Sequence, residues 1–218
     1  MAHESTWPLP PHVQLADFLP AELHRALIDW VLANEAKFRA ATVANRLDKN
    51  SRIDPAVRIA QTMRDLGPAR AAIEAKLLEA LPALMAATGI KGPEPRSLEL
   101  ELAAHGDGAH YDAHLDIPVG QGRRSIGARR GEDRVLSAVY YFYNEPKGFS
   151  GGALRLYRFN AKPAEDPAAD SYVDVQPLNN SLVAFPSWAT HEVRRVSCPS
   201  GAFRDYRFAL NCWYCRTL

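Results

Sequence analysis

The sequence contains few cysteines and almost no net charge, and both scarcities exclude whole classes of protein. Three cysteines among 218 residues are too few for a disulfide scaffold, and their odd number favours a reducing compartment. The 26 basic and 25 acidic residues give a net charge of +1, so no overall field attracts nucleic acid or an anionic membrane. No apolar run approaches the ~20 residues of a membrane span. The polar, proline-containing N-terminus shows no secretory signal. We therefore expect a cytoplasmic protein with no membrane partner.

Glycine and proline occur at ordinary levels, 13 and 16 residues, which excludes collagen-like and low-complexity chains. An apolar fraction of 47% over this length is enough for one sizeable core. We expect a single domain over residues 1–218, in which residues 1–92 form a helical buttress and residues 93–218 form the sheets.

Two amphipathic helices are predicted in the first 92 residues. Apolar residues at three- and four-residue spacing follow Pro20, namely Leu23, Leu27, Trp30 and Val31. Proline suits the first turn of a helix because its missing N–H has no helical partner there. A second helix is expected from Pro68 to Ala87, ending at Thr88-Gly89, with Pro82 kinking or dividing it. The polar stretch from Asn45 to Asp54 is expected to be a loop.

From Pro95 onward the apolar period changes to two, which is typical of strands. Three leucines, at positions 98, 100 and 102, alternate with Glu99 and Glu101, so this strand has one apolar face and one wet face. Seven further strands are expected at Ala109–Ile117, Val135–Tyr143, Ala153–Phe159, Ser171–Val175, Ser181–Phe185, Thr190–Val196 and Tyr206–Tyr214. Eight short strands after a helical section favour an antiparallel sandwich or barrel with helices packed on one face.

Three His-x-Asp pairs lie close together in the chain: His105/Asp107, His110/Asp112 and His114/Asp116. On a strand, residues i and i+2 project from the same face, so each pair offers an imidazole and a carboxylate to one ion. His191, far downstream in another predicted strand, would supply a third ligand. Two histidines and one carboxylate on one face suit non-haem Fe(II) and leave coordination positions open. Spacing alone does not choose among the pairs, and a lone His-x-Asp is most often a polar strand face.

The sequence resembles the Fe(II)- and 2-oxoglutarate-dependent oxygenases, and within them the prolyl-hydroxylase-like branch. That branch often shows an aromatic residue, then Gly, Tyr and His-x-Asp, each after two intervening residues. The last four places are taken here by Gly108, Tyr111, His114 and Asp116, and His105 replaces the first aromatic residue. Four later landmarks follow in the family's order: Tyr140-Tyr141, Gly151-Gly152-Ala153-Leu154, His191-Glu192-Val193, and Arg207 with Trp213 six residues later.

The resemblance implies a double-stranded β-helix, or jelly roll, with the N-terminal helices packed against its larger sheet. It selects the third pair and implies that the Fe(II) ligands are His114, Asp116 and His191. Arg207 would bind the far carboxylate of 2-oxoglutarate bidentately, and Tyr141 would donate a hydroxyl hydrogen bond to it. Arg204 is a rival for the role of Arg207, because the interval after His191 is longer than the family usually has. Ascorbate is a further candidate cofactor, and no catalytic residue beyond these ligands is implied.

The implied activity is hydroxylation of a prolyl residue, another peptide side chain or a small amino-acid-like metabolite. Nucleic-acid demethylation of the alkylation-repair type is an alternative, but that branch carries a second Arg where this chain has Trp213. A non-catalytic jelly-roll binding module is another alternative, favoured if the three ligand side chains do not converge. A halogenase is disfavoured, because those enzymes generally have no carboxylate at the place of Asp116.

The stretch from Gly120 to Arg134 carries five arginines and several glycines, which is typical of a solvated surface loop. The resemblance adds that this segment borders the active-site mouth. It is therefore also a candidate lid over an acidic or polar substrate.

Overall fold

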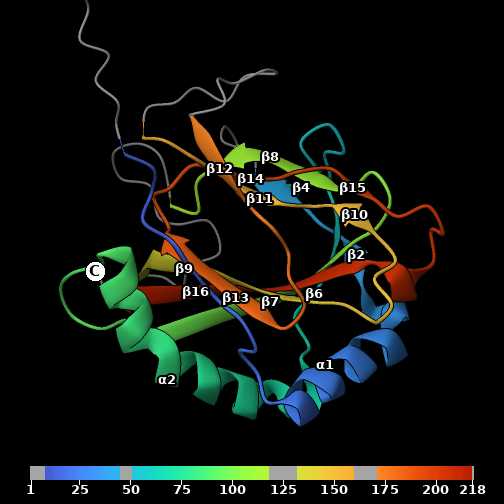
Figure 1. Ribbon diagram of the computed structural model, residues 1–218, viewed down its shortest axis with the longest axis horizontal. Coiled ribbons are helices and arrows are strands. Elements are labelled where there is room, and N and C mark those ends of the chain that lie inside the picture. The colour runs from blue at the N-terminus through green and yellow to red at the C-terminus, as the bar shows by residue number, and fades with distance from the viewer. Residues whose placement is uncertain (1–7, 45–50, 118–131, 160–170, 218) are drawn as a thin grey trace, which may run out of the picture.

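The computed structural model describes residues 8–44, 51–117, 132–159 and 171–217. Two sheets face one another, and two helices cover the outer face of the larger sheet (Figure 1). In spatial order the larger sheet consists of β1 (Val13–Leu15), β13 (Ser181–Pro186), β9 (Glu132–Phe142), β16 (Arg207–Thr217), β7 (Ser97–His105), β6 (Gln61–Met63) and β2 (Arg39–Ala40). The smaller sheet consists of β12 (Tyr172–Val175), β11 (Leu154–Tyr157), β14 (His191–Val193), β8 (His110–His114) and β5 (Arg58–Ile59).

Every pairing within these two sheets is antiparallel. Two-stranded ribbons join β3 (Val43–Ala44) to β4 (Ser51–Arg52) and β10 (Ser150–Gly151) to β15 (Val196–Ser197). Short 3₁₀ helices lie at Glu35–Lys37 (η1), Gly67–Ala69 (η2) and Phe203–Asp205 (η3). The predicted jelly roll, with its helices against the larger sheet, is confirmed.

The two predicted helices are α1 (Ala21–Ala33) and α2 (Arg70–Thr88). Pro20 directly precedes the first turn of α1. Gly89 ends α2 with a φ of 69°, a left-handed conformation that a residue without a Cβ adopts at little cost. The predicted end of this helix at Thr88-Gly89 is confirmed.

Pro82 neither ends nor divides α2, which continues through it. Proline cannot donate the backbone hydrogen bond of its turn, so another interaction must hold the helix together there. Leu81 and Leu84 flank the proline and are 3% and 1% exposed. Their packing keeps the helix continuous, and the division that the sequence allowed does not occur.

The main apolar core lies between the helices and the larger sheet. The helices contribute Leu27, Val31, Ile73, Leu77, Leu81 and Leu84, and the sheet contributes Leu100, Leu102, Phe142, Leu182, Leu210 and Tyr214. Burying one such side chain contributes about 2 kcal/mol, so this layer attaches both helices to the sheet.

The opposite faces of the same strands turn toward the smaller sheet. On β7 the leucines pack on the helices, so Glu99, Glu101 and His105 face the interior between the sheets. Glu101 Oε1 lies 3.5 Å from Nη2 of Arg58, which comes from β5 of the smaller sheet. The wet face predicted for this strand is therefore the interior of the double sheet and not the outer surface.

Residues 1–92 contain more than helices. Their described part also has six short strands, of which β1, β2 and β6 extend the larger sheet and β5 forms an edge of the smaller one. The expectation of a helical buttress is incomplete, because strands of two or three residues leave no periodic pattern.

Two predicted boundaries also differ from the structure. The expected strand Thr190–Val196 is two strands, β14 and β15, which pair in different sheets. Ser51–Arg52, inside the loop expected from Asn45 to Asp54, forms β4, while residues 45–50 lie outside the described residues.

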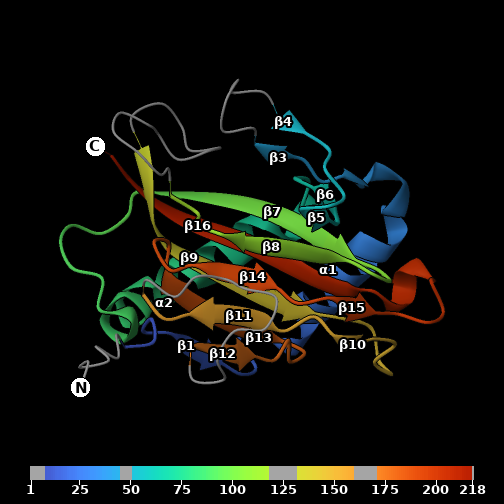
Figure 2. The same cartoon turned by 90° about the horizontal axis from the view of Figure 1, so that it is seen from above.

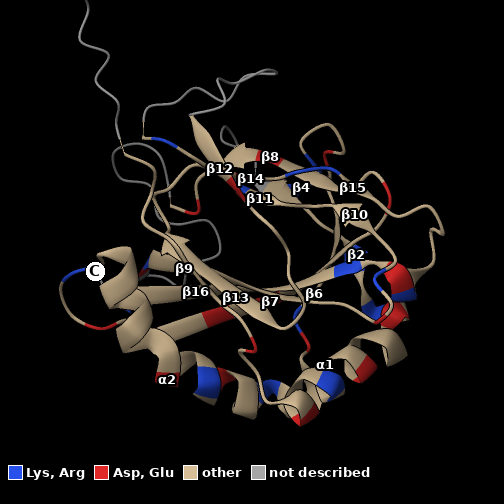
Figure 3. Ribbon diagram, viewed as in Figure 1, with Lys and Arg blue, Asp and Glu red and all other residues tan. Residues whose placement is uncertain are grey.

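Charged residues of both signs are interspersed along α1 and α2 (Figure 3). On α2, Arg70 pairs with Glu74 and Lys76 pairs with Glu79, each at 2.9 Å. Such surface pairs contribute roughly 0.3–0.5 kcal/mol each, far less than the apolar layer beneath them. Among the described residues, no helix has the length and apolarity needed to cross a membrane.

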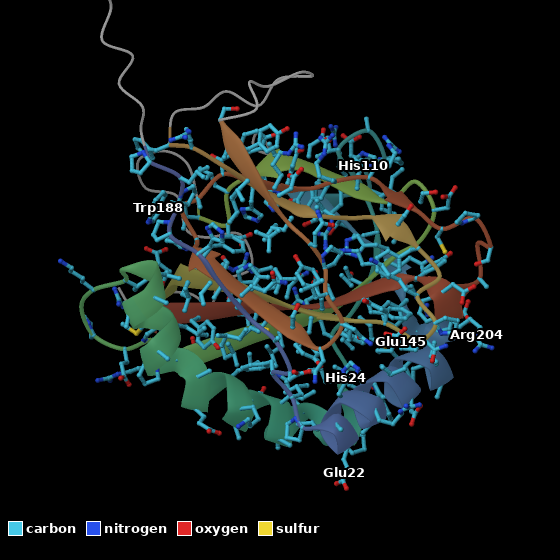
Figure 4. The ribbon with its side chains drawn as sticks, viewed as in Figure 1. Glu22, His24, His110, Glu145, Trp188 and Arg204 are labelled. Carbon is cyan, nitrogen blue, oxygen red and sulfur yellow. The ribbon has the colours of Figure 1, made fainter. Side chains whose placement is uncertain are left out.

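Tyr140 faces the helices and belongs to a partly buried polar network. Its hydroxyl donates a hydrogen bond to Asn180 Oδ1 at 2.8 Å and accepts one from His24 Nδ1 at 2.7 Å; Figure 4 labels His24 below the larger sheet. Asn180 also accepts from the N–H of Leu19 and donates to its carbonyl, both at 2.9 Å. The network fixes the segment that leads into α1 to the turn before β13.

We expect Tyr140→Phe to lower the free energy of unfolding by about 1–2 kcal/mol, because His24 and Asn180 lose a buried partner. Equilibrium urea unfolding measures this change. Ligand binding between the sheets should be unaffected, since Tyr140 faces away from that interior. An unchanged unfolding midpoint would mean that the network does not anchor the segment before α1.

Candidate metal centre

Three predicted ligand residues meet between the sheets. His114 ends β8 and His191 begins β14, and the two strands lie side by side with these residues opposite one another (Figure 2). Asp116 Oδ1 is 3.9 Å from His114 Nε2, and Asp116 Oδ2 is 3.6 Å from His191 Nε2. One ligand atom from each residue lies within 4.8 Å of the others, and no other such group of three occurs among the described residues.

Backbone carbonyls orient both imidazoles. His114 Nδ1 donates a hydrogen bond to the carbonyl of Asp112 at 2.8 Å, and His191 Nδ1 donates to the carbonyl of Ala189 at 2.9 Å. With the proton on Nδ1, each neutral ring carries its lone pair on Nε2, the atom nearest Asp116. Metal-binding histidines usually have this outer hydrogen bond, which fixes the tautomer and the ring plane.

Two serines hold Asp116. Ser137 Oγ, on β9, donates to Asp116 Oδ2 at 2.6 Å, and the carbonyl of Ser187, just after β13, accepts the N–H of Asp116 at 3.2 Å. The two serine hydroxyls are 2.9 Å apart. Neither serine was predicted from the sequence, although a small polar residue inside the apolar stretch Val135–Tyr143 is a signal that pointed to Ser137.

The other two His-x-Asp pairs do not form such a cluster. His110 Nδ1 bonds to a nearby backbone carbonyl at 3.1 Å, and the Asp112 side chain is 58% exposed; Figure 4 labels His110 on the smaller sheet. Asp107 accepts a hydrogen bond from a backbone N–H, and His105 contacts Arg207. The structure thus brings together the pair that the family register selects, and metal ligation by it stays a prediction.

Burial and neighbouring charge set the protonation of the cluster. Burial and the nearby His191 lower the pKa of His114 to about 3. Burial raises the pKa of Asp116, but His191, His114, Arg134 and the Ser137 hydrogen bond together outweigh this and lower it to about 2. At neutral pH the imidazole is therefore neutral and the carboxylate ionised, the states that bind a metal cation.

We expect the metal-free protein to lose stability as the pH falls below about 6.5. Unfolded His114 takes up a proton near that pH, whereas the folded ring stays neutral until about pH 3. The unfolded state binds more protons between these values, so the free energy of unfolding rises with pH across the interval. Urea unfolding in the presence of a chelator measures the slope. It should be shallower in His114→Gln, and equal slopes in both proteins would show that His114 does not cause the effect.

Arg207, at the start of β16, faces the same interior and is 1% exposed. Its guanidinium carbon lies 4.7 Å from the centre of the Tyr141 ring. Arg207 Nε and Tyr141 Oη are both buried, and neither has a hydrogen-bond partner within the described part of the chain. Two adjacent unsatisfied donors are costly, and a carboxylate would satisfy both. The two side chains therefore fit the far carboxylate of 2-oxoglutarate.

Gly152 makes room for Arg207. A Cβ on Gly152 would lie 2.6 Å from Arg207 Cδ and 3.0 Å from Arg207 Nε, and the φ of this residue is +71°. Any side chain would therefore strain the backbone and displace the arginine. This close approach is a physical reason for the Gly-Gly motif.

Arg204, the predicted rival of Arg207, lies in η3 at the edge of the molecule (Figure 4). Its side chain is 68% exposed, and its nearest acidic partner is Asp205 at 4.0 Å. A group in this position does not reach the interior between the sheets. The role of Arg207 itself stays a prediction.

We expect Tyr141→Phe to leave the free energy of unfolding unchanged or slightly higher, because it removes a buried hydroxyl that has no described partner. It should weaken 2-oxoglutarate binding about tenfold, the effect of losing one hydrogen bond to a charged group. Calorimetric titration of the Mn²⁺-loaded protein measures this affinity. Tyr140→Phe is the matched control. It should lower the free energy of unfolding and leave the 2-oxoglutarate affinity unchanged. Equal affinity in Tyr141→Phe and the wild type would remove the Tyr141 hydroxyl from the binding site.

Residues 120–131 of the predicted lid lie outside the described residues. Its last residue, Arg134, belongs to β9: Arg134 Nη2 is 2.6 Å from Glu99 Oε2, and its guanidinium carbon lies 3.9 Å from the centre of the Trp213 ring. The predicted loop boundary at Arg134 is therefore wrong, because an ion pair and an aromatic contact hold this residue in the strand.

Arg58 also lies near the cluster and was not predicted from the sequence. Its guanidinium carbon lies 4.8 Å from the centre of the Tyr111 ring, and Tyr111 stacks on His114 with ring centres 3.7 Å apart. A cation, a phenol ring and a predicted ligand thus form one column. Arg58 comes from the two-residue strand β5, which has no periodic pattern to reveal it.

Solved structures show the same fold. A prolyl-4-hydroxylase from Pseudomonas putida matches with a TM-score of 0.62 and 26% identity, covering 94% of this chain and 93% of that one. A prolyl hydroxylase from Trichoplax adhaerens, in complex with a hypoxia inducible factor peptide fragment, matches with a TM-score of 0.63 and 18% identity. That match covers 94% of this chain and 83% of the other.

Sequence comparison gives the family. An uncharacterised PKHD-type hydroxylase from Synechocystis is 37% identical over 143 residues, which are 66% of this chain; the chain spans 44% of that relative's length. Residues 100–215 match the 2OG-Fe(II) oxygenase superfamily, and this stretch contains His114, Asp116, His191 and Arg207. The chain therefore belongs to the 2OG-Fe(II) oxygenase superfamily.

Proposed function

We propose that this chain is an Fe(II)- and 2-oxoglutarate-dependent dioxygenase that hydroxylates a prolyl or other peptide side chain, or a small amino-acid-like metabolite. The observation that carries the proposal is the combination of two features in one interior. One is the two-histidine, one-carboxylate cluster. The other is the buried Arg207 guanidinium, whose Nε has no hydrogen-bond partner among the described residues, and neither has the neighbouring Tyr141 hydroxyl. Membership of the superfamily supports the same metal and cosubstrate.

Each residue has a distinct role in the proposed reaction. The cluster of His114, Asp116 and His191 would hold iron on one face and leave its other positions open. Arg207 would bind the far carboxylate of 2-oxoglutarate, with a second hydrogen bond from Tyr141. When bound, iron, 2-oxoglutarate and O₂ supply an oxidation that yields succinate and CO₂ and inserts one oxygen atom into a substrate C–H bond. The protein contributes orientation and a largely water-free interior.

Side chains near the cluster support a peptide or amino-acid-like substrate. Glu99 and Glu101 face the interior from β7, and Asn211 and Trp213 share the strand parity of Arg207 on β16. Asn211 lies directly opposite Glu101 in the strand register. The two carboxylates are paired with Arg134 and Arg58. The Asn211 carboxamide suits the amide groups of a peptide or an amino acid. The likeness to the Pseudomonas putida prolyl-4-hydroxylase supports a prolyl residue.

The two alternatives receive less support. Trp213 stands where the alkylation-repair branch has its second Arg, and a net charge of +1 offers no field for nucleic acid. Convergence of the three ligand side chains argues against a non-catalytic binding module. A cytoplasmic location is part of the proposal, supported by three buried cysteines without a disulfide.

Turnover tests the proposal. Protein is loaded anaerobically with Fe(II) and 2-oxoglutarate, O₂ is admitted, and succinate is followed with prolyl peptides or amino acids, with and without ascorbate. We expect substrate-dependent succinate formation that is lost in Asp116→Ala. Undiminished turnover in that variant would contradict the proposed metal site.

Arg207→Ala should raise the KM for 2-oxoglutarate roughly 100-fold, because two charge-assisted hydrogen bonds are lost, and should leave Fe(II) affinity nearly unchanged. Arg204→Ala is the matched control, since it removes an exposed guanidinium of the same charge, and its KM should equal that of the wild type. A KM that rises only in Arg204→Ala would transfer the carboxylate site to η3.

A further inference from the structure

His105 and Arg207 form a buried pair between the sheets. They lie directly opposite one another on the neighbouring strands β7 and β16. His105 is 4% exposed and Arg207 is 1% exposed. His105 Nδ1 lies 3.1 Å from Arg207 Nη1, which is a hydrogen-bond distance. The register of the two strands therefore fixes this contact.

The chemistry of the two groups decides the direction of this hydrogen bond. A guanidinium has five donors and no acceptor, so His105 Nδ1 must accept and carry no proton. The proton of the neutral ring is then on Nε2. Burial, and after it the positive charges of Arg207 and Arg58, hold the pKa of His105 well below its usual value of 6.5. The ring is thus neutral at physiological pH.

The contact with His105 uses Nη1 and does not involve the Nε–Nη2 edge of the Arg207 guanidinium. Nη1 is used by His105, and Nε has no partner among the described residues. Nε and Nη2 together form the edge that binds a carboxylate through two parallel hydrogen bonds. Gly152 lies against this side of the arginine, where a Cβ would be only 3.0 Å from Nε.

We propose that His105 is a positioning residue of the cosubstrate site: its neutral imidazole holds Arg207 Nη1 so that the Nε–Nη2 edge meets the far carboxylate of 2-oxoglutarate. This proposal rests on the proposed function. A neutral acceptor suits the task, because it fixes the guanidinium plane and leaves its full positive charge for the ligand. A carboxylate at position 105 would fix the arginine equally well but would compete with the cosubstrate for it.

Calorimetric titration of 2-oxoglutarate into Mn²⁺-loaded protein tests this role, with Mn²⁺ affinity as a separate readout. We expect His105→Leu to weaken 2-oxoglutarate binding about tenfold, the effect of losing one hydrogen bond to a charged group, and to leave Mn²⁺ affinity unchanged. His105→Gln retains a neutral acceptor and should restore most of the affinity. His110→Leu is the matched control on β8, a strand of the smaller sheet, and should bind 2-oxoglutarate like the wild type.

His105→Glu separates positioning from simple packing. It keeps Arg207 paired, so the protein should fold, yet it should bind 2-oxoglutarate more weakly than His105→Gln. Wild-type 2-oxoglutarate affinity in both His105→Leu and His105→Glu would overturn the proposal. Arg207→Ala distinguishes this outcome from failure of the proposed function. If Arg207→Ala also binds 2-oxoglutarate normally, Arg207 is not the carboxylate site. If only the His105 variants bind normally, His105 has no positioning role.

Discussion

The alternation of side chains along β7, β9 and β16 is the constraint on which the rest of the structure depends. One face of these strands is apolar and is buried under α1 and α2. The opposite face cannot be covered by the same helices, so the smaller sheet packs over it and encloses its polar residues. Glu101, His105, Ser137 and Arg207 all project into that enclosed space because each has the strand parity opposite to the apolar residues. The strands whose apolar face forms the main core thus also place the chemically active groups together on their opposite face.

Enclosure gives these groups their properties. Burial keeps His114 neutral, and charged neighbours keep Asp116 ionised, so the cluster is prepared for a cation before one binds. The same burial leaves Arg207 and Tyr141 with donors that no described residue accepts. Ala209 lies two residues after Arg207 on β16 and is opposite Tyr141 in the strand register. Its side chain places only a methyl group beside the Tyr141 ring. The interior therefore presents a two-histidine, one-carboxylate cluster and a buried guanidinium, the two features that binding of a chelating dicarboxylate cosubstrate would require.

Much of the fold follows from sequence, because long elements carry clear periods. The leucines that alternate with Glu99 and Glu101 predicted β7, and the glycine of Thr88-Gly89 predicted the end of α2. The strands of residues 1–92 were not predicted, because each has only two or three residues and is too short to show a period. Arg58, on β5, was missed for this reason. The division of α2 that Pro82 allowed does not occur, because tertiary packing of its neighbours outweighs the missing hydrogen bond.

The residues of the candidate site were likewise predicted only in part. The spacing of the His-x-Asp pairs left three equivalent candidates, and only the family register selected His114 and Asp116. The contact of Ser137 with Asp116 and the contact of His105 with Arg207 depend on which strands become neighbours, and that is a property of the whole fold. Local sequence therefore indicates candidate ligands, whereas the residues that orient them emerge only when the sheet is assembled.

A crystal structure of the protein with Mn²⁺ and 2-oxoglutarate tests the central claim most directly. We expect the ion on the Nε2 atoms of His114 and His191 and the carboxylate of Asp116, with the far carboxylate of 2-oxoglutarate on Arg207 Nε and Tyr141 Oη. An ion bound by His110 and Asp112, or a cosubstrate carboxylate remote from Arg207, would contradict it.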